Sequence, residues 1–111
     1  MIEYGQFCPV AKAAEILGER WTLLVVRELL LGTTRFGELQ KALAKASPTI
    51  LTKRLKELEH SGIVRRRRRA GKKHAEYQLT RAGRELSGLI EQMGIWATRW
   101  APGRVVGEFL N

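Results

Sequence analysis

Residues 47–62 carry markers for both ends of one helix, and this segment constrains the fold more than any other. Ser47 can accept a hydrogen bond from a free backbone N–H at the start, and Pro48 suits the first helical position, where no N–H is needed. Gly62 can adopt the left-handed conformation that ends a helix. Apolar residues recur inside at spacings of four and three: Leu51, Leu55 and Leu58. One face of this helix is therefore expected in a core.

The other side of the same helix carries hydroxyl groups and cations and no acid: Thr49, Thr52, Lys53 and Lys56. Hydrogen-bond donors and positive charge on an outward face suit the major groove of duplex DNA. Ser47, at the helix start, belongs to the same candidate interface. A solvated face without a partner is the alternative. Arg54 lies between the two faces, so both a phosphate contact and an ion pair at the core edge remain open.

Positive charge is concentrated in one part of the chain. The formal net charge is +9, and residues 41–81 hold 13 of the 20 Lys and Arg but only three acids. A field carried by one segment is expected of a surface that binds a polyanion. A membrane surface could use the same charge, but no large apolar face lies beside this segment, so no membrane partner is expected.

Three helices are expected before residue 47, near residues 9–18, 21–31 and 36–43. The last of these is short, and only residues 44–46 separate it from the helix that starts at Ser47. Two short helices with a tight link, the second bearing a polar basic face, are the pattern of a helix-turn-helix. Arg35, just before the third helix, is a candidate phosphate ligand, with an ordinary surface role as the alternative.

After Gly62 the pattern changes from helical to alternating, which predicts two strands joined by a basic tip, a β-hairpin or wing. Its candidate DNA contacts are Arg66, Arg67, Arg68, Arg69, Lys72, Lys73 and His74. Like charges at this density repel one another unless a polyanion is present. We therefore expect the tip to enter a minor groove or to follow phosphates, with a solubilising loop as the alternative.

Thr80 is expected to cap a long final helix that Pro102 and Gly103 end. Its apolar residues recur as a seam: Leu86, Leu89, Met93, Trp96 and Trp100. Two tryptophans are costly to expose, and a small domain has little left to cover them. We therefore expect a homodimer interface formed by this seam with Val10, the alternative being that the seam covers the domain's own core. A two-fold dimer would place two Ser47 helices roughly 34 Å apart, in successive major grooves.

The chain length of 111 residues favours one domain over 1–111. We expect a DNA-binding core near 20–80 and dimerisation helices near 9–18 and 81–101. The first residues lack the basic start and apolar centre of a signal peptide, and the longest apolar run is too short and too charged to span a bilayer. A cytoplasmic, nucleoid-associated location is therefore expected.

Cys8 is the only cysteine, which excludes an internal disulfide and fits a reducing compartment. As a structural residue it would be small, apolar and buried. As a functional residue it lies at a helix start, where the helix dipole stabilises a thiolate, so it is also a candidate redox sensor.

No catalytic arrangement is evident: there is no nucleophile–base pair, paired carboxylates, phosphate-binding glycine loop or metal cluster. His60 and His74 lack metal-ligand spacing with each other or with Cys8. Neither an enzyme nor a cofactor or metal is expected. Two other functions remain open, an RNA-binding or ribosome-associated winged helix and a winged helix that binds proteins.

The order of these elements resembles the HxlR family of bacterial winged-helix transcription regulators, relatives of the MarR group. The matching residues are Cys8-Pro9-Val10, Gly18, Trp21-Thr22-Leu23-Leu24, Arg35-Phe36-Gly37-Glu38-Leu39, Ser47-Pro48, Leu51, Arg54-Leu55, Leu58, Gly62-Ile63-Val64, Tyr77-Gln78-Leu79-Thr80 and Gly83. The resemblance covers roughly residues 7–97. Two features depart from it, since residues 65–69 are denser in arginine than a family wing and the tail after residue 103 has no counterpart.

The resemblance implies an α+β winged helix-turn-helix and a homodimer that binds a palindromic operator near a promoter. Some members of the resembled family sense oxidants or electrophiles through a thiol at the position of Cys8. We expect repression by occupancy of the operator. A small-molecule or oxidant effector would act through the dimer seam, by changing the spacing of the two DNA-reading helices.

Overall fold

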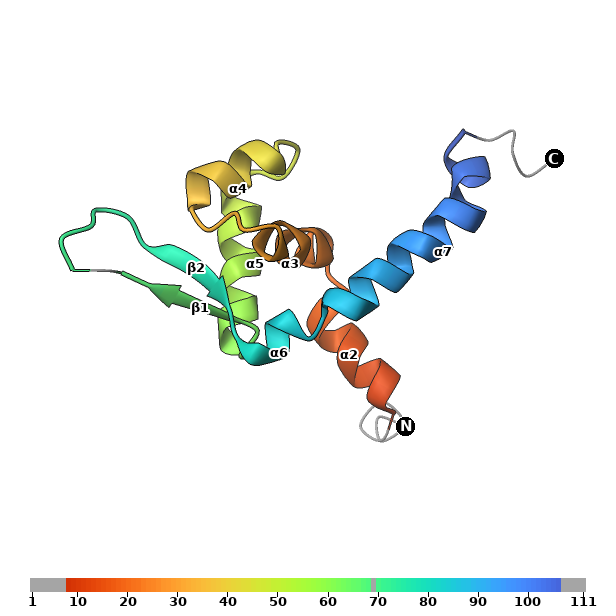
Figure 1. Ribbon diagram of the computed structural model, residues 1–111, viewed down its shortest axis with the longest axis horizontal. Coiled ribbons are helices and arrows are strands. Elements are labelled where there is room, and N and C mark those ends of the chain that lie inside the picture. Colours follow the sequence, from red (N-terminus) through yellow and green to blue (C-terminus); the bar gives the residue numbers. More distant parts are fainter. Residues whose placement is uncertain (1–7, 69, 107–111) are drawn as a thin grey trace.

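The computed structural model describes residues 8–68 and 70–106, and Figure 1 shows how their elements are arranged. The helices are α2 (Pro9–Leu17), α3 (Thr22–Leu30), α4 (Phe36–Ala42), α5 (Pro48–His60), α6 (Arg81–Arg84) and α7 (Ser87–Val106), and the strands are β1 (Val64–Arg67) and β2 (Glu76–Leu79). A mainly helical chain with a hairpin directly behind its helix-turn-helix confirms the expected α+β winged-helix class.

The core lies where α3, α4, α5 and the base of the hairpin meet. Its largest fully buried side chains are Val25, Val26, Leu39, Leu51, Leu55 and Leu58. The three leucines predicted on the inner face of α5 are among them. Each buried Leu or Val contributes about 1.5–3 kcal/mol relative to an exposed one. This burial fixes which side of α5 faces outward.

Both ends of α5 are capped as the sequence predicts. The Ser47 hydroxyl oxygen accepts a hydrogen bond from the Ile50 N–H at 3.1 Å. At the other end Gly62 has φ +79°, and the Ile63 N–H donates to the Leu58 carbonyl at 2.9 Å. The position and direction of the helix are thus set by its own sequence.

The turn between α4 and α5 is closed by a side chain. The Gln40 Nε2 group donates to the Ala46 carbonyl at 2.6 Å. Ala46 is itself almost fully buried. This hydrogen bond holds the short link of the helix-turn-helix against the core.

Trp21, at the start of α3, has a left-handed backbone with φ +81°. For an L-residue other than glycine this conformation costs about 1–2 kcal/mol. The Arg20 guanidinium lies 5.3 Å from the centroid of the Trp21 ring, which stabilises this turn of the chain. The helix expected near residues 21–31 therefore begins one residue later, at Thr22.

The hairpin pairs β1 with β2 in antiparallel register, with Val64 opposite Leu79 and Arg66 opposite Tyr77. Val64 and Leu79 are buried at its base. The Tyr77 N–H donates to the Thr34 carbonyl at 2.8 Å, which ties the hairpin to the loop before α4. The hairpin thus starts from a fixed base and projects away from the core (Figure 1).

The C-terminal segment differs from its prediction in two ways. Thr80 caps the short helix α6 and not the long one, because its hydroxyl donates to the Gly62 carbonyl at 2.6 Å and accepts from the Gly83 N–H at 3.2 Å, which holds α6 against the hairpin base. In addition, α7 continues past Pro102 to Val106. A proline inside a helix lacks an N–H donor and crowds the carbonyl four residues earlier, which is why Pro102 was expected to end the helix, but its φ is helical and α7 continues through it.

Helices α2 and α7 extend outward from the core (Figure 1). Leu17 is the buried residue of α2, and Leu86 and Ile90 pack partly against the core near the start of α7. Beyond them the apolar side chains of both helices are exposed. None of the helices in the described part of the chain combines the length and apolarity that a bilayer crossing requires.

Candidate nucleic-acid interface

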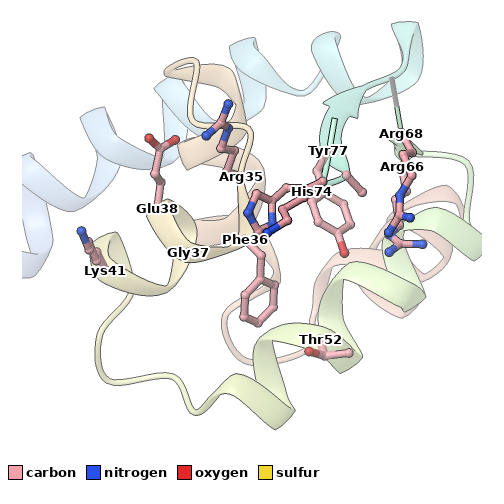
Figure 2. Close-up of a pocket in the computed structure, with 12 residues that line it drawn as sticks. Arg35, Phe36, Gly37, Glu38, Lys41, Thr52, Arg66, Arg68, His74 and Tyr77 are labelled. Carbon is pink, nitrogen blue, oxygen red and sulfur yellow. The ribbon is translucent and has the colours of Figure 1, made fainter. Parts of the chain in front are cut away.

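An open groove of about 550 Å³ lies between the start of α4, the first turns of α5 and the hairpin (Figure 2). Its lining residues are Arg35, Phe36, Gly37, Glu38, Lys41, Thr52, Arg66, Arg68, Lys73, His74, Ala75 and Tyr77. We call this surface the basic groove. It brings together predicted DNA-binding residues from three separate parts of the sequence, namely Arg35, Thr52, Arg66, Arg68, Lys73 and His74.

One wall of the basic groove is formed by α4. Arg35 precedes its first residue with an extended backbone, and its side chain is exposed. Lys41, in the last turn of α4, adds a second cation that the sequence analysis did not select. Glu38 is the acid of this lining. The wall is nevertheless net positive, as contact with a polyanion requires.

The opposite wall is formed by the hairpin, whose arginines do not all point into the groove. Side chains alternate between the two faces of a strand, so Arg66 and Arg68 line the groove while Arg67, although exposed, is absent from the lining. Lys72 is exposed at the tip and also does not line it. Arg69 lies outside the described residues. The hairpin cations predicted to contact DNA are therefore divided between two faces of the hairpin.

The floor of the groove contains two aromatic side chains that sequence reasoning missed as interface residues. Phe36 and Tyr77 are both half-buried, and Figure 2 shows them with His74 between Arg35 and the hairpin arginines. Tyr77 faces the groove because it pairs with Arg66, and directly opposed residues lie on the same face of a hairpin. The alternating pattern predicts two strands but not which residues are paired, so it could not place Tyr77 on the same face as Arg66.

The outward face of α5 is free of the core. Thr49, Thr52 and Lys53 are exposed, as is Ser47 at the cap. Lys56 is exposed too, but it borders a separate hollow beside α2, whose other charged or titratable lining residues are Glu15, Glu19, Glu57 and His60. The α5 residues nearest the basic groove are therefore those of its first turns.

Arg54, for which a phosphate contact and an ion pair were both open, is buried and does not belong to this exposed face. Only 7% of the residue is exposed. Its Nε donates to the Arg20 carbonyl at 2.7 Å, one terminal nitrogen lies 3.1 Å from Glu57 Oε1, and the other lies 3.6 Å from Glu19 Oε1. The alternative of an ion pair at the core edge is the one realised, because a buried guanidinium requires such partners.

Cys8 caps α2 and is half-buried. Its sulfur accepts a weak hydrogen bond from the Ala11 N–H at 3.4 Å. The thiol is therefore neither sealed in the core nor fully solvated. Val10, in the first turn of the same helix, is 76% exposed.

The predicted seam leaves an exposed apolar face on α7. Its members are Leu89, Met93, Trp96 and Trp100, of which Trp96 is 63% and Trp100 57% exposed. The alternative that this seam covers the domain's own core applies only to its first residue, Leu86, which packs against the core cluster.

Known proteins share both the sequence and the shape of this chain. YvaP of Bacillus subtilis (strain 168), an HTH-type transcriptional regulator, is 40% identical over 98 residues, which are 86% of this chain and 91% of YvaP. The regulator YodB of the same organism is 35% identical over 104 residues, 91% of this chain and 93% of YodB.

Solved structures show the same likeness in three dimensions. The crystal structure of PA1607 matches with a TM-score of 0.80 and 37% identity, covering 85% of this chain and 66% of PA1607. Quinone-bound YodB from B. subtilis matches with a TM-score of 0.72 and 34% identity, covering 85% of this chain and all of that one. YvaP and YodB are both HTH-type transcriptional regulators, which confirms the expectation from the sequence that this chain is a regulator and not an enzyme. The sequence profile of the HxlR-like helix-turn-helix family matches residues 16–104, so the chain belongs to this family of helix-turn-helix transcriptional regulators, as the resemblance implied.

Proposed function

We propose that this protein binds a palindromic DNA operator as a homodimer and represses transcription by occupying it. The observation that carries the proposal is the basic groove, in which Arg35, Thr52 and Arg66 come from three elements to one surface. Membership of a family of helix-turn-helix regulators supports duplex DNA as the partner.

In this proposal the first turns of α5 enter the major groove, where Thr49, Thr52 and Lys53 reach base edges and phosphates. Arg35 binds a phosphate from the α4 side. Arg66 and Arg68 hold the backbone from the hairpin side, and the tip residues follow an adjacent minor groove. Phosphate contacts then dominate the affinity, so binding weakens with salt at a log–log slope of about −0.9 per neutralised phosphate.

The hairpin offers a matched pair of variants for this contact. Arg66→Ala removes a cation that lines the basic groove, and Arg67→Ala removes an equal charge one residue further along, outside that lining. We expect Arg66→Ala to lower operator affinity more than Arg67→Ala and to reduce the salt slope by about 0.9. Selection of bound sequences from a random duplex pool supplies the operator. A flat salt dependence of the wild type, or a preference for structured RNA over duplex, contradicts the proposal.

The dimer is supported by the exposed apolar faces of α7 and α2. Trp96 and Trp100 together with Val10 present more apolar surface than a small monomer ordinarily leaves in water. We assign residues 9–18 and 81–101 to dimerisation and residues 20–80 to DNA binding. Sedimentation of the full chain is expected to give a dimer, and Trp96→Glu to give a monomer with weakened operator binding. A stable wild-type monomer at micromolar concentration contradicts this assignment.

A second function, response to an electrophile or oxidant, is favoured by the position of Cys8. Its sulfur lies at the start of α2, next to the exposed Val10. The similar protein YodB has been crystallised with a bound quinone and after diamide treatment. In our chain the Cys8 thiolate would add to a quinone ring carbon, and the ring would take up a proton to become the hydroquinone thioether. Quinone is expected to lower operator affinity of the wild type and not of Cys8→Ser; an equal response in both removes the proposal.

A further inference from the structure

Arg54 joins two separate parts of the chain, helix α5 and the turn at residues 19–20, through three partners. It reaches 34 residues back along the sequence to the Arg20 carbonyl, at 2.7 Å. It also pairs with Glu57 one turn further along α5, at 3.1 Å, and with Glu19 before α3, at 3.6 Å. The planar guanidinium can serve all three partners at once, since its five N–H groups point outward as a fork.

The segment that Arg54 binds is the turn between α2 and α3, residues 18–21. This turn contains the left-handed Trp21, and Arg54 hydrogen-bonds the carbonyl of the residue just before it. A strained backbone persists only where its surroundings hold it. Arg54 is one of the groups that hold it, and this turn determines the direction in which α2 leaves the core.

Helix α2 and helix α5 are otherwise separated by a hollow. Residues of α2, Glu15 and Ile16, line one side of it, and Lys56 and His60 of α5 line the other. An open space of this kind lets α2 change its angle without displacing packed side chains. The ionic contacts of Arg54 therefore constrain that angle where apolar packing does not.

The partners of Arg54 are not equivalent. The Glu57 contact lies within α5 and moves with it, so it cannot fix α5 relative to α2. The Glu19 side chain is 63% exposed and its contact is the longest of the three. Glu19 is consequently the partner that a shift of α2 releases first, whereas the Arg20 carbonyl stays hydrogen-bonded.

We propose that Arg54 is a positioning residue that sets the angle between α5 and α2 through Glu19, and that it transmits movement of α2 to the DNA-reading helix. The inference rests on the proposed DNA binding and adds to it how the outer helix governs the reading helix. In a dimer built on α2 and α7, this angle contributes to the spacing of the two α5 helices. Arg54 then influences DNA binding without touching DNA.

The test compares two acids of the same region. Glu19→Gln removes the releasable partner of Arg54, and Glu15→Gln removes an acid that lines the same hollow but pairs with Lys12 instead. Both substitutions raise the net charge by one, so a general electrostatic gain in DNA affinity cancels between them. Affinity is measured for the selected operator and for operators with one base pair inserted between the half-sites.

We expect Glu19→Gln to bind the operator roughly three- to tenfold more weakly than Glu15→Gln, with an unchanged salt slope, because no phosphate contact is lost. The preference for the native over the lengthened spacing is expected to fall as well, which a loss of overall stability alone would not produce. Arg54→Lys keeps the charge but not the fork, and it is expected to reproduce both effects more strongly.

Equal operator affinities and equal spacing preferences in Glu19→Gln and Glu15→Gln overturn the inference. So does a salt slope reduced by about 0.9 in Arg54→Gln, since that reports a phosphate contact at Arg54. Either result leaves the proposed function standing if the wild type binds duplex DNA with a steep salt dependence. Absence of such binding in the wild type instead removes the proposed function itself.

Discussion

Two junctions connect helix α5 and the hairpin behind it to the outer helices, and they are built from different interactions. At the α7 side, Thr80 and Gly83 fasten α6 to the backbone at Gly62 and Ile63 by hydrogen bonds and close packing. At the α2 side, Arg54 holds the turn at residues 18–21 by one hydrogen bond to the Arg20 carbonyl and one ion pair with the largely exposed Glu19. The packed junction at Gly83 has no room for an added methyl group, whereas the contacts of Arg54 can be weakened by replacing charged side chains. The difference suggests that α7 sets a fixed frame while α2 is the adjustable part.

The largest expected effect concerns the packed junction. A methyl group added in Gly83→Ala would collide with the Ile63 carbonyl oxygen and lie 2.8 Å from Leu79 Cδ2, so the backbone must shift. We expect a loss of about 1–3 kcal/mol in the free energy of unfolding, measured by urea titration. The control is Gly88→Ala, in α7 with nothing within 4 Å of the added carbon, which should stabilise the helix slightly. If Gly83→Ala has the same free energy of unfolding as the wild type, the backbone at this junction can shift without cost.

Next in size is the loss of the Thr80 hydroxyl. Thr80→Val keeps the shape but removes the donor to the Gly62 carbonyl and the acceptor for the Gly83 N–H. The expected destabilisation is about 1–2 kcal/mol. Thr80→Ser restores both hydrogen bonds and should recover most of that loss in thermal unfolding. If the serine variant is as unstable as the valine variant, packing of the methyl group and not hydrogen bonding holds this junction.

A smaller effect is expected at the contact between Arg54 and Glu57, which lies within α5 beside the ionic junction. Glu57→Gln weakens the 3.1 Å contact with Arg54, but the carboxylate is 43% exposed and solvent screens much of the interaction. We expect about 0.5–1 kcal/mol of destabilisation at low salt, shrinking as salt is added. Urea titrations at two ionic strengths measure it. A loss that does not change with salt would indicate that this contact, too, depends on packing.

The smallest effect should come from the exposed pair beside the packed junction. Arg81 and Glu85 lie 3.2 Å apart on α6, but their side chains are 87% and 68% exposed. Arg81→Ala is expected to change the free energy of unfolding by no more than about 0.5 kcal/mol. A loss comparable with that of Thr80→Val would mean that charge contributes to both junctions, and the contrast between them would then disappear.

Much of this fold could be predicted because the residues that determine each element are close together in the sequence. The caps at Ser47 and Gly62 and the leucine spacing of α5 depend on residues within a turn or two, and all three appear as expected. The alternation around Tyr77 likewise predicted the hairpin. Charge counting also placed the positive field in residues 41–81, which include Thr52 and the hairpin cations of the basic groove.

The rest depended on contacts between distant residues. Arg54 donates to the Arg20 carbonyl in the turn between α2 and α3, 34 residues earlier, and no spacing rule predicts this contact. The hydrogen bond that Thr80 donates to the Gly62 carbonyl joins the start of α6 to the hairpin base, and helix periodicity does not predict such a contact. The place of Tyr77 in the floor of the basic groove follows from strand register, which is set by how the hairpin packs on the core.

Close packing at Gly83 has a consequence for how such a regulator could be retuned. Because α7 leaves a fixed base, a residue inserted in its first turn would rotate everything beyond by about 100°, carrying Trp96 and Trp100 off the side where a second subunit would meet them. Insertions near multiples of a full helical turn would largely restore that side while lengthening the arm. At α7 the distance between subunits could thus change only in steps of whole helical turns. Smaller changes would come from the angle of α2.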